Sequence, residues 1–519
     1  MMQIAEAKFS PHTLSPISRT VERSGGTNVL ISFYVCSIIL VGFIIATDQV
    51  HHWFIVPVFA SGVLIGTDLV RWLRGQIDTF DPIGIIGLLG FHFFFLAPLL
   101  HVKWDSWMLY VVPPPDWRPW LGRMAVINLA GILVYFGSRS VFQRRFANQK
   151  SRSAWRLKPL LFGRLIGAGL VLTAALQILV YLRFGGITGY ITAFESRAGH
   201  FEGMGWLFTL SESFPILAFL AFAVLSRERV TWRQWGVIFG ALAAFLVLKL
   251  LFGGLRGSRS NTIWGLFWAV GIIHLWIRTV PRKLILAGLG FILVFLYVYG
   301  FYKTYGTEGI DAISVAEERA RLAEDSGRTW EGLILRDLGR SDVQAYVLYG
   351  LSPENGFGYS YSYSRGTTYA GALALVIPRQ IWPNRPATKV KAGTDLILGP
   401  GAYEAGLHAT RIYGLAGEAM LNFGPWAAPF AFVALGAVVA RVRNWIHAWR
   451  ATQDCRLLLA PLLINLCFNV LAMDSDNLVF FLIKNGTIPF IVILLSSKLL
   501  QLNLLLIGGG RESESRGHV

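Results

Sequence analysis

Twelve apolar runs constrain this chain more strongly than any other feature of its sequence. A helix needs about 20 residues to cross the hydrocarbon of a membrane, and the runs have roughly that length. They are apolar on all faces, whereas the strands of a membrane barrel would alternate, so their backbone polar groups must be satisfied within helices. The sequence therefore predicts an all-α fold, a polytopic transmembrane helical bundle. The expected spans are 27–47, 51–70, 83–101, 120–138, 160–182, 206–226, 235–253, 262–278, 284–303, 413–440, 457–473 and 478–497.

The basic residues predict the orientation of this bundle. The chain is 54% hydrophobic and 15% charged, with a mean hydropathy of +0.52, yet its formal net charge is +17. In a soluble protein such a charge would suggest nucleic acid as a partner. Here Lys and Arg concentrate in loops that fall on one side of twelve spans, which is typical of cytoplasmic loops. We therefore expect both termini to be cytoplasmic and nucleic acid not to be a partner. The loops are 139–158, 227–233, 278–283 and 441–456.

One long polar segment, 304–412, interrupts the apolar pattern between the ninth and tenth expected spans. It carries twelve acidic residues against eleven Lys and Arg, and it lies on the side opposite the basic loops. A connection of this length in a compact domain usually has a function. Its apolar spacing predicts helices over 312–325 and 329–351, which could lie at the membrane interface. The expected organisation is a tail (1–26), nine spans (27–303), this outer segment (304–412), three spans (413–497) and a second tail (498–519).

The turn 254–261, between the seventh and eighth expected spans, is a candidate site for an oxyanion. It holds Arg256 and Arg259 among glycine and serine residues. The planar guanidinium group suits phosphate, and glycine lets backbone N–H groups approach an anion. Positive residues are disfavoured in short outward loops, which favours a functional role for these two.

Three arginines of the outer segment are candidates for the same role. Arg336 and Arg340 are four residues apart on an expected helix, so they would share one face. A solvated charged surface is the alternative interpretation of this pair. Arg379 lies between Pro378 and Pro383, which would hold it rigidly unless they form only a structural corner.

Acidic and histidine side chains supply the candidates for a general base. Glu418, at the mouth of the tenth expected span, and His408, shortly before it, could each accept a proton, although either could be structural. Glu212 and Lys484 fall within expected spans, where they would either serve the function or pair with each other or with the backbone. Asp474, in a short outer loop, could pair with arginines or bind a cation. No metal site is predicted.

Four motifs on the expected outer side are Arg256-Gly257-Ser258-Arg259, Ile377-Pro378-Arg379, Trp382-Pro383, and Glu418 with Asn422-Phe423-Gly424. Together with the long outer segment, they resemble the bacterial oligosaccharide repeat-unit polymerases, the O-antigen or exopolysaccharide polymerases of the Wzy type. The resemblance implies a GT-C-like fold and a metal-independent glycosyltransferase of the bacterial inner membrane, without a cofactor. Such an enzyme transfers the growing glycan from undecaprenyl pyrophosphate to the nonreducing end of a new lipid-linked repeat unit at the periplasmic face.

The resemblance also implies roles and partners. The residues that would hold the leaving pyrophosphate are Arg256, Arg259, Arg336, Arg340 and Arg379. Glu418 is the first choice for the base and His408 the second. The implied partners are undecaprenyl-pyrophosphate-linked oligosaccharides and membrane lipid, and a chain-length regulator could be a further one.

Two other functions stay open. An O-antigen ligase would transfer the glycan to lipid A core or to a protein, and it shares the long outer loop and the arginines. A flippase of repeat units belongs to a different class. Transporters bind their cargo near the middle of the membrane through broken helices, whereas the polar residues of this chain gather on one side.

Overall fold

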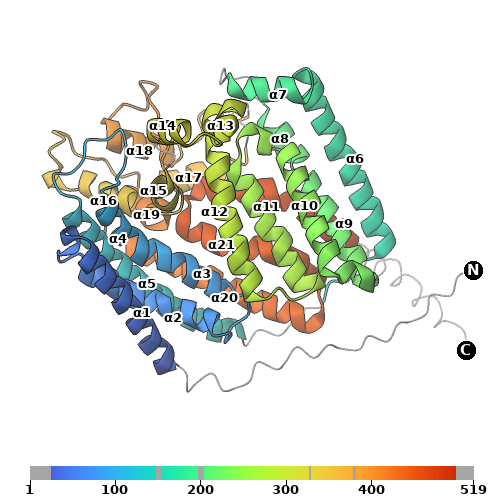
Figure 1. The fold of residues 1–519 in the computed structure, drawn as a ribbon, viewed down its shortest axis with the longest axis horizontal. Coiled ribbons are helices and arrows are strands. Elements are labelled where there is room, and N and C mark those ends of the chain that lie inside the picture. The colour runs from blue at the N-terminus through green and yellow to red at the C-terminus, as the bar shows by residue number, and fades with distance from the viewer. Residues whose placement is uncertain are drawn as a thin grey trace, which may run out of the picture.

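The computed structural model describes residues 25–147, 154–196, 201, 204–326, 329–377 and 381–497. Every regular element within these residues is helical, and eleven helical segments are long and apolar enough to cross a membrane (Figure 1). The prediction of a polytopic membrane helical bundle is confirmed. The eleven are α1 (Gly25–Ala46), α2 (Ile55–Leu73), α3 and α4 with the π-helical turn between them (Pro82–Trp104), α5 (Arg118–Ala147), α6 (Pro159–Arg183), α8 and α9 (Gly205–Glu228), α11 with the π-helical turn after it (Arg259–Ile277), α12 (Arg282–Tyr305), α20 (Ala427–Thr452), α21 with the turn before it (Cys455–Ala472), and α22 and α23 (Ser475–Ser497).

The remaining expected span is α10 (Trp235–Leu251), a shorter apolar helix of 17 residues. It joins the same two faces of the bundle as its neighbours. At its first residue, the Arg278 guanidinium lies 4.7 Å from the centre of a Trp235 ring. At its last residue, the Leu251 carbonyl accepts a hydrogen bond from the Tyr181 hydroxyl, near the end of α6. In the described part of the chain, α10 therefore makes a twelfth passage between the two faces.

The predicted basic loops gather at one end of the bundle. The Arg450 guanidinium donates to Asp78 at 3.0 Å, and Nε2 of His274 lies 2.9 Å from the same carboxylate. Arg443 donates to Asp81 at 2.8 Å. These contacts join the connection between α2 and α3 to the ends of α11 and α20. The charge pattern thus placed these loops correctly on a common face.

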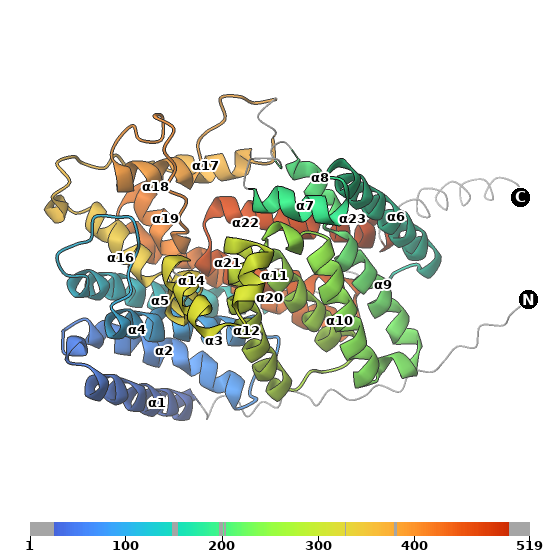
Figure 2. The same ribbon diagram turned by 45° about the horizontal axis from the view of Figure 1, so that its top comes forward.

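The outer segment forms a layer of short helices over the opposite end of the bundle (Figures 1 and 2). Helix α12 leads into this layer and runs along the outside of the bundle, where Phe291 and Val294 are exposed. In the structure the outer segment extends to Phe423, and its short helices are α13 (Thr307–Ala312), α14 (Ala316–Ser326), α15 (Trp330–Gly332), α16 (Ser341–Gly350), α17 (Thr367–Ala374), α18 (Lys389–Leu398) and α19 (Gly414–Phe423).

The expected continuous helix over 329–351 is wrong. The chain instead forms α15, a π-helical turn (Leu333–Asp337), and a separate α16. Gly339 favours the break because glycine is a poor helix former, and Arg340 has a non-helical backbone with φ −146°. Arg336 and Arg340 therefore do not share one face of a helix.

The tenth span begins later than expected, at Ala427 rather than at 413. Gly424 has φ +89°, a left-handed conformation that glycine adopts readily, and Pro425 follows it. This pair of residues separates α19 from α20. The boundary expected at 413 is corrected accordingly, and Glu418 lies on α19 rather than at the mouth of a span.

Close packing of two spans, α5 and α20, stabilises the bundle. A Cβ atom added at Gly436 of α20 would lie 2.0 Å from the Ser138 hydroxyl of α5, and one added at Gly131 would lie 2.6 Å from the Phe432 ring. Small residues at a helix interface let backbones approach, which strengthens van der Waals packing in a membrane. Helices α5 and α20 thus form a tight pair.

Candidate functional site

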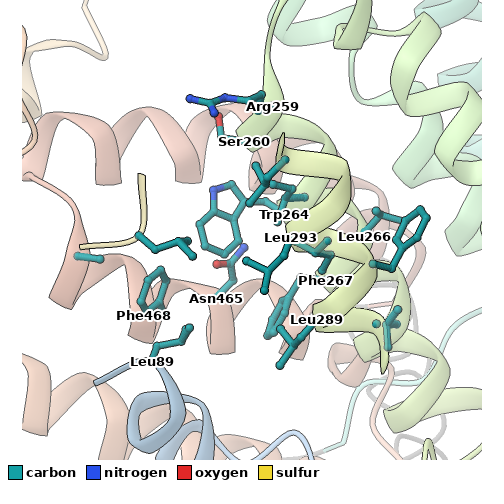
Figure 3. Close-up of a pocket in the computed structure, with 18 of the residues that line it drawn as sticks. Leu89, Arg259, Ser260, Trp264, Leu266, Phe267, Leu289, Leu293, Asn465 and Phe468 are labelled. Atoms are coloured by element: carbon teal, nitrogen blue, oxygen red, sulfur yellow. The ribbon is translucent and has the colours of Figure 1, made fainter. Parts of the chain in front are cut away.

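A cavity of about 1750 Å³ lies between α3, α10, α11, α12 and the outer segment. Figure 3 shows Arg259 and Ser260 at one end of it, and Phe267 and Leu289 further along. Away from this end the lining is largely aliphatic and aromatic, and α12 supplies much of it from Leu284 to Leu296. The cavity therefore has a polar mouth on the side of the outer segment and an apolar body within the bundle.

The mouth brings together arginines that lie far apart in the sequence. Arg256 and Arg259, from the turn between α10 and α11, line the same cavity as Arg336 and Arg340 from the outer segment. Arg379 lies outside the described residues. The four arginines thus share one space, although the expected reason for pairing Arg336 with Arg340 was wrong.

The structure adds three basic residues that the sequence-based set of ligands did not include. Lys303, Arg411 and Lys484 also line the cavity, which brings its basic residues to seven. Lys303 lies in the last turn of α12 and Lys484 within a span. A basic residue at the outer end of an apolar run was the signal that could have found Lys303. An excess of positive charge of this size favours an anionic ligand.

A buried carboxylate fixes one side of the mouth. Glu212 forms ion pairs with Arg256 and, at 2.5 Å, with Lys484. It also accepts a hydrogen bond of 2.7 Å from the Asn261 amide. Of the interpretations that the sequence left open for Glu212 and Lys484, the structure shows that they pair with each other. Glu212 holds Arg256 and Lys484 in place, and it offsets part of their charge.

The turn that carries Arg256 depends on glycine. Gly253 has φ +122°, and a Cβ atom at this position would lie 2.6 Å from the Glu212 carboxyl carbon. The Arg256 guanidinium in turn lies 4.0 Å from the centre of the Phe208 ring, a distance that suits a cation–π contact. The position of Arg256 is therefore set from two sides, by a carboxylate and by an aromatic face.

All four π-helical turns in the described residues contribute to the cavity. Such turns are rare and occur frequently at functional sites, because they displace side chains from the regular helical register. Nε2 of His92 contacts the Ile334 carbonyl at 3.1 Å, so two of the turns also touch each other. The turns are His92–Leu96, Ile273–Ile277, Leu333–Asp337 and Leu482–Gly486, and their lining residues include His92, Ile273, Arg336 and Lys484.

Neither predicted base lines this cavity. Glu418 is buried and accepts hydrogen bonds from the Thr368 hydroxyl at 2.7 Å and from the Ser475 hydroxyl and backbone N–H at 2.6 Å each. Burial raises the pKa of Glu418, and the hydrogen bonds from Ser475 and Thr368 oppose that rise. His408 is exposed beside the Tyr403 ring. The structure gives Glu418 a role in joining α17, α19 and α22, and catalysis by either residue stays a prediction.

Asp474 pairs with a lysine rather than with the arginines that the sequence suggested. One of its oxygens forms an ion pair with Lys389, and the other accepts hydrogen bonds from the backbone N–H groups of Tyr413 at 2.9 Å and Gly414 at 2.8 Å. Burial raises the pKa of Asp474 to about 7, against the lowering effect of the Lys389 ammonium group. We call the contacts of Asp474 and Glu418 the clasp, because they hold α17, α18 and α19 against the start of α22.

Replacing Lys389 with methionine is expected to lower the free energy of unfolding by about 3–5 kcal/mol, because it leaves a buried carboxylate without its counter-ion. Since the pKa of Asp474 is raised to about 7, its carboxyl group is neutral well below that pH. The loss should therefore be larger at pH 8 than at pH 5. Chemical unfolding in mixed micelles at both pH values measures it.

The matched control is Lys391→Met, two residues away, whose partner Glu404 is exposed. Exposed ion pairs contribute little, so this variant should unfold like the parent protein. Equal losses in the two variants would contradict the proposed importance of the clasp.

Comparison of the chain with protein-family models, with curated proteins and with solved structures finds no match. Among the described residues, no group of three or more His, Cys, Asp and Glu side chains is arranged to hold a metal ion. The class that the fold defines is a polytopic α-helical membrane protein.

Proposed function

We propose that the protein is a glycosyltransferase that polymerises lipid-linked oligosaccharide repeat units. The observation that carries this proposal is the cavity, which joins seven basic residues at its mouth to a long apolar body. Its shape and chemistry match a ligand with an anionic head and a long hydrocarbon tail. Undecaprenyl pyrophosphate has both features, and the arginines suit the charge that its diphosphate carries as a leaving group.

The proposed reaction takes place on the side of the outer segment. Because the basic loops gather at the other end of the bundle, the positive-inside rule favours a cytoplasmic position for that end. The mouth of the cavity would then face the periplasm of a bacterial inner membrane. The body of the cavity offers few polar groups below the mouth. It therefore suits a hydrocarbon tail better than a glycan in transit, which argues against a flippase.

The test is chain extension by the purified protein in liposomes. Undecaprenyl-pyrophosphate-linked repeat units, extracted from the cells that make the protein, are supplied with EDTA present. We expect longer glycans that remain on undecaprenyl pyrophosphate. Transfer to lipid A core or to a protein would instead identify a ligase, and movement of the lipid across the bilayer without glycan transfer would overturn the proposal.

A further inference from the structure

A single acidic side chain lies among the described residues that line the cavity. It is Asp342, the second residue of α16, and it follows Arg340 by two positions. Asp342 is 3% exposed and lies in a lining that is otherwise rich in basic residues. Burying a carboxylate is costly unless it is paired or hydrogen-bonded, so the contacts of Asp342 show how it is held.

The contacts of Asp342 leave one carboxylate oxygen for the cavity. Oδ1 accepts a hydrogen bond of 2.8 Å from the backbone N–H of Val343 and lies 3.7 Å from Nε2 of His101. Within the described part of the chain, both contacts involve Oδ1. Oδ2 therefore keeps its lone pairs for a ligand in the cavity that Asp342 lines.

The imidazole of His101 is oriented toward this carboxylate. Nδ1 lies 2.5 Å from the Ser106 carbonyl, and because a carbonyl only accepts, Nδ1 must carry the hydrogen. Nε2 is fully buried and has no hydrogen-bond partner among the described residues. Nε2 of His101 thus faces the Asp342 carboxylate and has no competing hydrogen bond among the described residues. A separation of 3.7 Å is within ion-pair range but too long for a direct hydrogen bond.

Aromatic stacking fixes the position of the imidazole. The ring of His101 stacks on Trp107 with centroids 5.4 Å apart and an interplanar angle of 13°, and Trp107 stacks on Trp117 at 4.9 Å and 2°. Trp117 then contacts Tyr346, which lies on α16 with Asp342. The stack therefore positions α4 and α16, and with them the two members of the pair, relative to each other.

We propose that Asp342 is the general base of the site and that His101 is the residue that positions it. This inference rests on the proposed glycosyltransferase function. Oδ2 of Asp342 accepts the proton of the acceptor sugar hydroxyl while the hydroxyl oxygen forms a bond to the anomeric carbon of the donor. The bond from that carbon to the pyrophosphate oxygen breaks, and its electron pair leaves with undecaprenyl pyrophosphate. Protonated Asp342 then returns the proton to water.

Other proton acceptors at the cavity are less well placed for this step. His92 also lines the cavity, but its Nε2 donates to the Ile334 carbonyl, so only Nδ1 of this ring is left to accept a proton. Glu418 is held by three hydrogen bonds within the clasp. Asp342 combines access to the cavity with a position close in sequence to Arg340, so a base and a ligand for the leaving group come from one short segment.

The first test is Asp342→Asn, which keeps the shape of the side chain and its bond from Val343 but does not accept a proton. We expect chain extension to fall by about 100-fold or more. Binding of undecaprenyl pyrophosphate, measured by isothermal titration in nanodiscs, should stay within about twofold, since binding does not need the base. The control is Glu354→Gln, an exposed acid that follows α16, which should extend chains at the parental rate.

A second variant keeps the test decisive if Asp342→Asn binds the lipid poorly. In Asp342→Ala, added formate should restore part of the extension rate, because a small carboxylate can occupy the vacated space and accept the proton. The parent protein should show no such response. In His101→Gln we expect kcat to fall while KM for the lipid-linked donor is unchanged.

Three results would overturn the inference. They are parental extension by Asp342→Asn, absence of formate rescue in Asp342→Ala, and loss of extension in His92→Gln while Asp342→Asn remains active. If the parent protein itself binds undecaprenyl pyrophosphate but extends no chains, it is the proposed function that fails. The two failures are therefore distinguishable.

Discussion

Replacing Gly288 with tryptophan is expected to weaken binding of the lipid-linked donor strongly while the protein stays folded. Gly288 lies on α12 and lines the cavity, and a Cβ atom added there would meet nothing within 4 Å. An indole at this position would occupy space that the proposed tail needs. Overpacking costs about 1–3 kcal/mol, and each 1.4 kcal/mol is roughly tenfold in affinity. Donor binding should therefore weaken by about ten- to hundred-fold.

The neighbouring glycine provides a matched control for this prediction. Gly290, two residues along α12, is exposed, does not line the cavity, and would also meet nothing within 4 Å. Gly290→Trp places the same side chain on the same helix but toward lipid. It should bind and extend like the parent protein. Equal behaviour of the two variants would show that the body of the cavity holds no tail.

Varying the length of the donor's hydrocarbon tail provides a second test of the same prediction. Gly288 is 15 residues from Lys303 at the mouth, which is about 22 Å at the rise of an α-helix. Only a donor whose tail reaches that depth should be sensitive to tryptophan. A short-tailed pyrophosphate-linked repeat unit should therefore be extended equally by Gly288→Trp and by the parent, and a penalty independent of tail length would contradict the assignment.

Removing the Arg259 side chain is expected to reduce chain extension by about 100-fold or more, the effect of deleting one positioned donor to a developing negative charge. Arg259 stands at the mouth of the cavity, at the start of α11, as Figure 3 shows. The reduction should appear mainly in kcat if Arg259 stabilises the leaving pyrophosphate. The temperature of thermal unfolding should stay close to that of the parent protein, so that unfolding does not explain the lower kcat. Steady-state kinetics with lipid-linked repeat units, together with thermal unfolding, measure both.

Arg229→Ala is the control for the loss of one positive charge. Arg229 is exposed at the end of α9, among the basic loops at the opposite end of the bundle. Its removal changes the net charge equally but leaves the mouth unaltered. Parental kinetics in Arg259→Ala, or equal losses in both variants, would show that the mouth does not bind the pyrophosphate.

The helical bundle could be predicted because hydrocarbon imposes a simple demand on sequence. Each span needs a long apolar run, and α1 and α6 can be recognised in the sequence from such runs. The predicted helix boundaries were wrong where glycine or proline interrupts a helix within an apolar pattern. Gly339 ends the turn before α16, and Gly424 with Pro425 separates α19 from α20.

Much of the site depends on contacts that no local pattern records. Arg256 and Arg340 are 84 positions apart, and only the fold brings both to one cavity. The partner of Asp474 proved to be Lys389, a residue of the outer segment. Asp342 lay unnoticed because a single acid at the start of a short helix is an ordinary feature. Its importance emerges only from the cavity and from His101.

The helices of the outer segment fall into two groups that pack against different parts of the bundle. Helices α17 to α19 are tied to α22 through the buried pair of Lys389 and Asp474. Helices α13 and α14 instead contact α12, which is largely exposed on the outside of the bundle. We therefore expect an opening that admits a lipid sideways from the bilayer to involve α12 with α13 and α14 rather than the helices held by the clasp. Exchange of substrate and product would then respond to the fluidity of the surrounding lipid.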